Sequence, residues 1–405
     1  MHLGFYSFVM DKIVLKQEMT AELERILSFW MRETLDEKNG GFLGEIDVNN
    51  IPLENAPKGA ILNARILWAF SSAYLTTQNP DYLTTASRAY KYIVSRFLDP
   101  DFGGVYWEVD ALGRPLNTRK QFYALAFTMY GLVEYHRACG NKDALGVAIE
   151  LFEVIEKYSF VTEQNGYIEA RARDWSLLVD VRLSEKDENA PLTMNTHLHI
   201  LEAYTNLFRV WKDDNLAAQL KNLIVIFLDK IIVNETANFG LFFDNDWNMQ
   251  SHKVSYGHNI EGSWLLHEAA EVLGDKLLLK RTEAMAIRMA KVTAVEGLAA
   301  DFSILNELNE DTGHLDEDRH WWPQAEGIVG FYNAYQLTSD EKFLTISANI
   351  WDYTKSHLLD TTNGEWFWRV DARGNTYPDD CKVGFWKCPY HNGRACLEIM
   401  NRIVT

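Results

Sequence analysis

Cysteine is scarce in this sequence of 405 residues, which contains only Cys139, Cys381, Cys388 and Cys396. Four cysteines are too few for a scaffold stapled by disulfides, and their spacing matches no zinc-binding pattern. We therefore expect reduced thiols, which is the usual state of cysteine in a cytoplasmic protein.

Positive charge is also in the minority, since 39 lysines and arginines face 57 acidic residues and the formal net charge is −18. A protein that binds nucleic acid or an anionic membrane needs a basic surface to neutralise phosphates, and no basic stripe is present. We expect neither nucleic acid nor membrane among the partners. A Gly-x-Gly-x-x-Gly motif after a strand is missing as well, which argues against a nicotinamide cofactor.

Long apolar runs, export signals and linkers are missing too. No stretch reaches the roughly 18 apolar residues that a membrane helix needs. The apolar run at the N-terminus is short, without a basic flank or a small-residue cleavage site, so we expect no signal peptide. Proline is rare, with nine residues, and no proline- or serine-rich linker interrupts the chain. We predict an N-terminal extension over residues 1–13 and a single catalytic domain over residues 14–405.

Aromatic side chains, in contrast, are abundant, with 13 Trp, 18 Tyr and 21 Phe. Most rings in any chain belong to the core, but flat aromatic faces also suit sugars, whose axial C–H groups pack against them. With 47% hydrophobic and 24% charged residues, the composition is that of a soluble globular protein.

A short stretch rich in glycine and aromatic residues recurs along the chain, for example at 39–52, 102–115 and 363–378. The stretches at 102–115 and 363–378 share the alternation and the turn residues of a small β-hairpin. Pairs of segments with apolar residues at i, i+3, i+4 and i+7 lie between them, which is the helical period. Twelve helices are predicted, over 12–35, 58–78, 81–98, 119–139, 141–158, 192–212, 214–233, 257–273, 275–293, 321–338, 340–357 and 391–403.

The turns between paired helices are brief, so the two helices of a pair must be antiparallel neighbours. Six such pairs predict an all-α fold, an (α/α)6 barrel with one helix of each pair inside and short β-hairpin loops at one mouth. Inner helices should be apolar on all sides because both their faces are buried. Segments 58–78, 119–139, 257–273 and 321–338 have this character. The inner helices all follow long loops, so we expect their N-termini to gather at that mouth.

The first turns of the inner helices carry polar and aromatic side chains before the apolar runs begin. Asn195 and His199 are four residues apart, and His258 and Glu261 are three apart, so each pair shares a helix face. His197 points away from that face. The other candidates at these helix starts are Arg65, Tyr123, Trp321, Trp322, Glu326 and His391. Their convergence on one cavity, with many ionisable groups, predicts a functional site there.

The remaining histidines, including His320, are interpreted as structural. A lone histidine at a helix start is usually a structural residue, and it is the convergence of several inner-helix starts that separates the candidates from the others.

Three kinds of chemistry are compatible with this set. A metal ion is one, because His258 and Glu261, with His199 and His391, make a scattered ligand set that lacks the usual zinc signatures. Glycoside hydrolysis is the second and needs two opposed carboxylates, for which only Glu261 and Glu326 are available.

The third chemistry is proton abstraction next to a carbonyl. Two imidazoles on opposite faces of one carbon would remove and return a proton, while Arg65 stabilises the enediolate. The excess of imidazole over carboxylate pairs at the mouth favours this third interpretation. It requires no metal and no redox cofactor.

Five motifs together carry a family resemblance: "KGAILNARILWAF", "MNTHLHILEAYTNLF", "SYGHNIEGSWLLHEAAEVLGD", "HWWPQAEGIVGFYNAYQLTSD" and "FWKCPYHNGRACLE". With them the chain resembles the N-acylglucosamine 2-epimerase superfamily, and within it the branch that acts on cellobiose and related β-1,4-linked disaccharides. The resemblance runs from about residue 14 to residue 403. It implies an (α/α)6 barrel and reversible inversion at C2 of a reducing-end glucose, through ring opening and a cis-enediolate.

The resemblance also implies roles for particular residues. His258 and His391 would be the acid and base that flank C2, Arg65 would stabilise the enediolate, and His199 and Glu261 would assist ring opening. The residues implied to bind the sugar are Tyr123, Asp187, Asn195, Trp321, Trp322, Glu326, Trp386 and Asn392. The resemblance implies a small sugar as the only partner, no cofactor, and a monomer or weak homodimer.

Small departures from the family pattern occur at Asn259, Gly262, Pro323 and Gly327. These positions lie next to implied catalytic residues, so we expect them to influence substrate preference more than reaction class. Other enzymes of the superfamily epimerise free mannose or glucose, or isomerise mannose to fructose, and these activities remain alternatives. A glycoside hydrolase or a non-catalytic sugar-binding protein on the same fold are more distant ones.

Overall fold

The structure is a computed structural model, and it describes residues 12–403. Its helices are α1 (Lys12–Glu33), α2 (Ala60–Thr77), α3 (Pro80–Tyr92), α4 (Phe122–Cys139), α5 (Lys142–Tyr158), α6 (Met194–Val210), α7 (Asp214–Ile226), α8 (Tyr256–Leu273), α9 (Lys276–Glu296), α10 (Trp321–Thr338), α11 (Glu341–His357) and α12 (His391–Arg402). All twelve predicted helices are confirmed. The predicted extension over residues 1–13 lies outside the described residues except for Lys12 and Ile13, which belong to α1.

Two predicted helices end differently from the expectation. The last turns of α3 and α7 are π-helical, η1 (Ile93–Phe97) and η2 (Phe227–Ile231), where we predicted continuous helices through residues 98 and 233. Ile93 and Phe97 are both buried, as are Phe227 and Ile231. Two apolar residues four positions apart face the core in an α-helical turn and in a π-helical turn alike. The spacing of apolar residues therefore does not distinguish the two kinds of helix.

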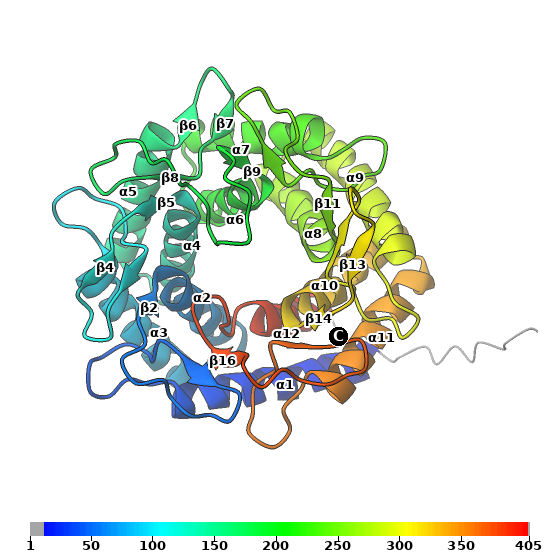
Figure 1. Cartoon of the computed structure of the whole chain (residues 1–405), viewed down its shortest axis with the longest axis horizontal. Coiled ribbons are helices and arrows are strands. Elements are labelled where there is room, and N and C mark those ends of the chain that lie inside the picture. Colours follow the sequence, from blue (N-terminus) through cyan, green and yellow to red (C-terminus); the bar gives the residue numbers. More distant parts are fainter. Residues whose placement is uncertain (1–11, 404–405) are drawn as a thin grey trace, which may run out of the picture.

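The helices form a closed double ring (Figure 1). Helices α2, α4, α6, α8, α10 and α12 make the inner ring, and α1, α3, α5, α7, α9 and α11 surround it. Helix α12 packs between the inner helices α10 and α2 and takes α1 as its outer partner, so the two ends of the chain form the sixth pair and close the ring. The predicted (α/α)6 barrel is confirmed.

Burial separates inner from outer helices as predicted. In α2, 13 of 18 residues are buried, whereas in its outer partner α3 only 5 of 13 are. Neighbouring inner helices approach closely at Gly131 of α4, where a Cβ atom would lie 2.7 Å from the carbonyl oxygen of Ala64 in α2. Among the described helices, none combines the length and the apolar character that a membrane crossing requires.

Short antiparallel strands lie at one mouth of the ring (Figure 1). They are β1 (Ile46–Asp47), β2 (Lys58–Gly59), β3 (Glu108–Val109), β4 (Pro115–Asn117), β5 (Lys120–Gln121), β6 (Phe160–Val161), β7 (Gly166–Tyr167), β8 (Ala170–Arg171), β9 (Leu192–Thr193), β10 (Phe242–Phe243), β11 (Lys253–Ser255), β12 (Glu307–Asn309), β13 (His314–Asp316), β14 (Arg319–His320), β15 (Arg369–Val370) and β16 (Cys381–Val383).

The strand pairing repeats around the ring. Each inner helix is preceded by a strand that pairs with a strand in the segment after its outer partner, as β2 pairs with β3 across the α2–α3 hairpin and β5 pairs with β8 beyond α5. The last such pair joins β16, before α12, to β1, after α1, with Ile46 opposite Val383. These pairs hold the N-termini of the inner helices at the mouth, where we expected them.

Buried ion pairs reinforce three of these junctions. An aspartate just after an outer helix binds a lysine in the strand before the next inner helix, with both side chains almost fully buried. The pairs, with their N–O distances, are Asp36–Lys58 at 2.7 Å, Asp99–Lys120 at 2.8 Å and Asp360–Lys382 at 2.5 Å.

Candidate active site

A cavity of about 850 Å³ opens at the strand-bearing mouth of the ring. Its wall is built from the first turns of the inner helices, from residues 182–188 of the long loop before α6, and from strand residues at the rim. The predicted site residues that line it are Arg65, Tyr123, Asp187, Asn195, His199, His258, Glu261, Trp321, Trp322, Trp386 and His391. The structure therefore brings together eleven of the thirteen predicted residues in one cavity.

His258 lies on the first turn of α8 and is held by the residue before that helix. Its Nδ1 atom lies 2.7 Å from the hydroxyl of Ser255. Burial lowers the pKa of His258 to about 3, and the nearby His199 and Arg65 also lower it. The ring is therefore neutral at neutral pH, which is the form that can accept a proton.

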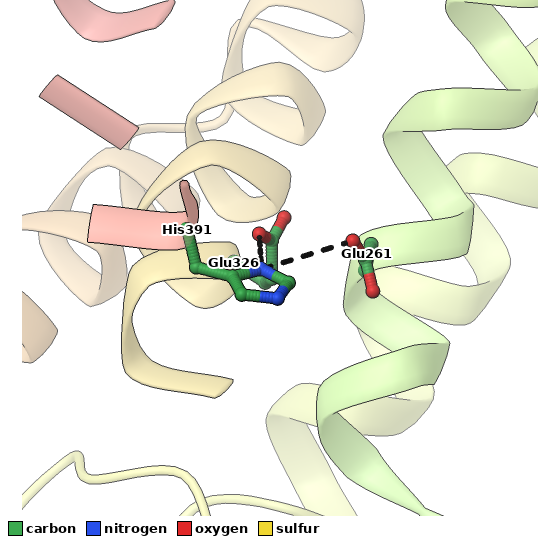
Figure 2. Close-up of side chains that lie close together, drawn as sticks. All are labelled: Glu261, Glu326 and His391. Carbon is green, nitrogen blue, oxygen red and sulfur yellow. Dashed lines mark hydrogen bonds and ion pairs between the residues drawn. The ribbon is translucent and has the colours of Figure 1, made fainter. Parts of the chain in front are cut away.

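His391 is the first residue of α12 and is held by carboxylates. Its Nδ1 atom lies 2.7 Å from Oε1 of Glu326 and 4.0 Å from Oε1 of Glu261, as Figure 2 shows. Burial lowers the pKa of His391 well below its usual range, and the positive charges of Arg65 and Arg394 lower it further. This imidazole is also neutral at neutral pH.

The ring of Trp322 contacts both imidazoles. Its centroid lies 4.6 Å from that of His258 and 5.7 Å from that of His391. Two neutral histidines from helices that are far apart in the sequence thus lie beside the same indole and line the same cavity.

Arg65 places a buried guanidinium in the cavity wall. It donates to the hydroxyl of Tyr123 at 2.9 Å and to the carbonyl oxygen of Trp386 at 3.4 Å, and it lies over the rings of Phe127 and Tyr390. Its Nε–H is buried and has no partner among the described residues. A fixed cation with unused donor capacity is suited to an anionic oxygen of a ligand.

His199 belongs to a buried polar network that the sequence analysis did not identify. Its Nδ1 atom lies 2.9 Å from Oε2 of Glu202, and the other oxygen of that carboxylate accepts from Tyr390 and Arg394. Arg394 also donates to Glu261 and Glu326, so it joins three acidic residues from three inner helices.

A regular spacing in the sequence could have indicated this network. Three inner helices carry a histidine followed by a charged residue three positions later, namely His199 with Glu202, His258 with Glu261, and His391 with Arg394. Residues three apart on a helix share a face. We used this rule for the second pair and not for the other two.

Aromatic rings and unpaired polar atoms line the rest of the cavity. Trp386 lies edge-on to Tyr123, and Trp321 lies beside His391. The Oδ1 atom of Asn195 and the Nε1 atom of Trp321 are buried and without hydrogen-bond partners in the described structure. Such atoms are available to a polar ligand that has apolar faces, as a sugar has.

Asp187 lies on the loop before α6 and accepts from the backbone N–H of Ser184 at 2.9 Å and from its hydroxyl at 3.0 Å. Burial raises the pKa of this carboxyl. The same loop covers part of the cavity, and Gln121 binds it by donating to the carbonyl oxygens of Val181 and Arg182.

Two predicted sugar-binding residues do not line the cavity. Asn392 is fully buried and donates to Glu365 at 2.6 Å, and Glu326 lies behind His391, where Trp264 and Arg394 also bind it. Glu326 was predicted from its place at a helix start and Asn392 from the family resemblance, but side-chain packing between helices turns both inward. The opposite holds for His320. We interpreted it as a structural residue, but it lines the rim of the cavity.

Two residues of α8 that depart from the family pattern, Asn259 and Gly262, also face away from the cavity. Asn259 accepts from the backbone N–H of Phe239 at 2.9 Å, and a Cβ atom at Gly262 would lie 2.2 Å from the ring of the same Phe239. Both residues therefore accommodate a packing contact with the loop after α7.

The carboxylates do not have the arrangement that glycoside hydrolysis needs. Glu261 and Glu326 share one Arg394 nitrogen, which lies 2.5 Å and 2.6 Å from their Oε1 atoms. A hydrolase places its two carboxyl groups on either side of the scissile bond, separated by about 5 Å or more. Of these two carboxylates, Glu261 lines the cavity and Glu326 does not.

The predicted metal set does not come together either. The atoms of Glu261, Glu326 and His391 that could bind an ion lie within 4.8 Å of one another, but His258 and His199 are not part of this group. Arg394 already supplies the positive charge between the two carboxylates. A divalent cation would have to compete with that guanidinium.

Comparisons with known proteins agree with this geometry. A sequence model of the N-acylglucosamine 2-epimerase (GlcNAc 2-epimerase) family matches residues 41–395. Cellobiose 2-epimerase of Bacteroides fragilis is 52% identical over 392 residues, covering 96% of this chain and 100% of that protein. Cellobiose 2-epimerase of Dictyoglomus turgidum is 38% identical over 397 residues, covering 97% of this chain and 100% of that protein. The solved structure of cellobiose 2-epimerase from Bacillus thermoamylovorans superposes with a TM-score of 0.93 at 41% identity, covering 96% of this chain and all of that one.

Proposed function

Because the chain belongs to the N-acylglucosamine 2-epimerase family, we propose that it reversibly epimerises C2 of the reducing-end glucose in β-1,4-linked disaccharides. Cellobiose would give glucosyl-mannose, and lactose would give epilactose. The observation that carries the proposal is the pair of neutral imidazoles, His258 and His391, which line one cavity and contact the same Trp322.

The reaction begins with opening of the reducing-end ring, for which Glu261, His199 and Asn195 are suited by position. Burial raises the pKa of Glu261 to about 7, with a further contribution from Glu326, while Arg394 lowers it. A carboxyl group that titrates near neutrality can both give and take a proton, as ring opening requires.

Proton transfer at C2 then inverts that carbon. One imidazole removes the C2 proton, the C–H electron pair forms a C1=C2 double bond, and the carbonyl electrons move to O1. Both imidazoles are neutral at rest, so the second one first takes up a proton, which Glu261 can supply because its carboxyl titrates near neutrality. It then gives this proton to the opposite face of C2 as the electrons return, and the first imidazole releases the proton that it removed, which restores the carboxyl of Glu261. Each histidine exchanges its role with the other in the reverse reaction.

Arg65 stabilises the negative charge that develops on the enediolate oxygens. Its guanidinium is buried, with an Nε–H that has no partner among the described residues, so its interaction with an anionic oxygen is stronger than in solution. Tyr123, Trp321, Trp322, Trp386 and Asp187 form the walls that hold the two sugar rings. The mechanism uses no metal ion and no redox cofactor.

We propose a single catalytic domain that acts in the cytoplasm as a monomer or weak homodimer. The location is supported by the four cysteines, all of which are unpaired, two of them buried. The acidic net charge of −18 supports the proposal that neither nucleic acid nor a membrane is a partner.

Incubation of the purified protein with cellobiose in D2O tests the function. We expect a mannose-ended disaccharide that carries deuterium at C2, detected by sugar chromatography and NMR. A fructose-ended product would indicate proton return to C1 and therefore isomerisation. Release of free glucose would instead indicate hydrolysis, and binding without exchange at C2 would indicate a non-catalytic sugar-binding protein.

Parallel incubations complete this test. Mannose and glucose as substrates distinguish a monosaccharide enzyme from a disaccharide enzyme, and lactose tests tolerance at the second sugar. Activity should survive treatment with a chelator. Loss of activity on chelation, restored by a divalent cation, would contradict the metal-free mechanism.

A further inference from the structure

Arg394 lies one turn into α12 and is buried at the centre of the polar network behind the cavity. One guanidinium nitrogen donates to Oε1 of Glu261 at 2.5 Å and to Oε1 of Glu326 at 2.6 Å. Its other terminal nitrogen donates to Glu202 and to the hydroxyl of Tyr390, which in turn donates to Glu202. No atom of Arg394 lines the cavity, so it touches no substrate.

Two of these carboxylates hold catalytic imidazoles. Glu326 lies 2.7 Å from Nδ1 of His391, and Glu202 lies 2.9 Å from Nδ1 of His199. Arg394 therefore donates directly to the carboxylate that holds His391 and to the carboxylate that holds His199.

The charge of the carboxylate decides where the imidazole carries its proton. An ionised carboxylate only accepts, so the Nδ1 of His391 must carry the hydrogen, and Nε2 keeps the lone pair that acts as a base. A protonated Glu326 could donate to Nδ1 instead. The hydrogen would then be on Nε2, and this nitrogen could no longer remove a proton from C2.

Without Arg394, burial would favour the protonated carboxyl groups. Burial raises the pKa of Glu326 above its ordinary value even with Arg394 in place, and Arg394 is the strongest of the groups that limit this rise. Burial also raises the pKa of Glu261, and its neighbour Glu326 adds to this. For Glu202, burial acts in the same direction, but Arg394, His199 and Tyr390 outweigh it and lower the pKa to about 2.

We propose that Arg394 is a positioning residue for the epimerisation, which keeps the carboxylates of Glu326 and Glu202 ionised and thereby holds the hydrogens of His391 and His199 on Nδ1. This inference rests on the proposed function. It deepens that function, because it makes the basicity of a cavity imidazole depend on a cation that never meets the sugar.

The test compares Arg394→Met and Arg394→Lys with the wild type. Methionine fills similar space without charge, and a lysine ammonium cannot reach three carboxylates at once. For Arg394→Met we expect kcat on cellobiose to fall on the order of 10²–10⁴-fold, the range for losing a positioned base. KM should change far less, and the acidic limb of the pH profile should move up by about one unit or more.

Arg402→Met is the matched control on the same helix. Arg402 pairs with Glu398 and with Asn333 at the far end of α12. Its guanidinium also lies over the ring of Trp264, 5.7 Å from the ring centroid, but no hydrogen bond or ion pair joins it to Glu202, Glu261 or Glu326 in the described structure. This variant should keep the wild-type kcat and pH profile. Equal losses in Arg402→Met and Arg394→Met would mean that α12 is merely destabilised, and would overturn the proposal.

A spectroscopic readout separates this inference from the proposed function. Long-range ¹H–¹⁵N correlations distinguish the two imidazole tautomers, and the signal of His391 is assigned with His391→Gln. We expect hydrogen on Nδ1 in the wild type and on Nε2 in Arg394→Met, whatever substrate the protein takes. An unchanged tautomer in Arg394→Met would overturn the proposal even if the wild type is an active epimerase.

If Arg394→Met does not fold, Tyr390→Phe decides the matter. It removes one hydroxyl between Arg394 and Glu202 and keeps the ring that packs on Arg65. Losing one charge-assisted hydrogen bond should lower kcat on the order of tenfold and move the acidic limb of the pH profile upward, as expected for Arg394→Met and, to a smaller extent, for Arg394→Lys. Wild-type kinetics in both Tyr390→Phe and Arg394→Lys would contradict the proposal.

Discussion

At the scale of single residues, the two central histidines differ in what lies behind them. Nδ1 of His258 meets the neutral hydroxyl of Ser255, whereas Nδ1 of His391 meets the carboxylate of Glu326. A hydroxyl can donate or accept, but a carboxylate only accepts. The tautomer of His391 is therefore determined by its partner, while that of His258 can adjust to the ligand.

Replacing either histidine should remove one half of the proton transfer. For His258→Ala and for His391→Ala we expect turnover of cellobiose to fall on the order of 10²–10⁴-fold, because each imidazole is needed as acid or base in both directions. The measurement is the appearance of the mannose-ended product and of deuterium at C2 in D2O.

His252→Ala is the control for these variants, since His252 is exposed and pairs with Asp311 away from the cavity. It should keep the wild-type rate. A wild-type rate in either cavity variant would remove that histidine from the mechanism.

At the scale of elements, the inner helices depend on buried contacts at their N-terminal ends. The Asp36–Lys58, Asp99–Lys120 and Asp360–Lys382 pairs each join an outer helix to the strand before the next inner helix. In each pair the lysine is at most 1% exposed, so neither charge is solvated by bulk water. Removing one partner leaves the other charge buried and unpaired, which destabilises a protein more than removing both.

The Asp360–Lys382 pair offers a double-mutant test of this point. Asp360→Asn should lower the free energy of unfolding by about 3–5 kcal/mol, because the ammonium of Lys382 stays buried. The double variant Asp360→Leu with Lys382→Met should lose clearly less. Urea unfolding followed by circular dichroism measures both.

The exposed pair Lys221–Asp275 serves as the reference, with a similar N–O distance of 2.8 Å. Lys221→Met should change the free energy of unfolding by at most about 1 kcal/mol, as exposed ion pairs usually do. A loss for Asp360→Asn no larger than this reference value would mean that the buried pairs do not hold the junctions.

At the scale of the whole molecule, closing the ring buries titratable groups that must stay uncharged. Burial lowers the pKa of His197 to about 4, although its bond to the carbonyl oxygen of Thr193 raises it. Burial raises the pKa of Glu169 to about 8, although the hydroxyls of Thr193 and Thr196 lower it. The folded state therefore prefers a neutral imidazole and a neutral carboxyl group.

These shifts predict that stability declines on both sides of a maximum. The His197 contribution is complete above the unfolded pKa of about 6.5 and is lost as the pH falls towards 4, by on the order of 3 kcal/mol. The Glu169 contribution is complete below the unfolded pKa of about 4.5 and is lost as the pH rises through 8. Urea unfolding between pH 4 and pH 9 measures the curve.

Glu169→Gln isolates the alkaline side, since the amide has the same shape and does not titrate. Relative to the wild type, this variant should gain stability between pH 5 and pH 9. A difference that does not depend on pH would show that Glu169 does not titrate in this range.

The sequence alone was sufficient for the local features. Apolar periods and short turns predicted the twelve helices, their pairing and which of them are inner, because a helix must turn its apolar residues inward wherever it packs. The same spacing placed His258, His391 and Arg65 on first turns or nearby, and all three line the cavity. The π-helical ends of α3 and α7 were missed, because they satisfy the same period.

Only the tertiary structure decided which polar groups meet. Glu326 and Asn392 carry no local sign that they turn towards His391 and Glu365, and Arg394 carries none that it joins Glu202, Glu261 and Glu326 from three other helices. Spacing along one helix tells which side chains share a face. The partner across a helix–helix contact depends on the angle and the offset of the second helix, and these are set by the packing of the closed ring as a whole.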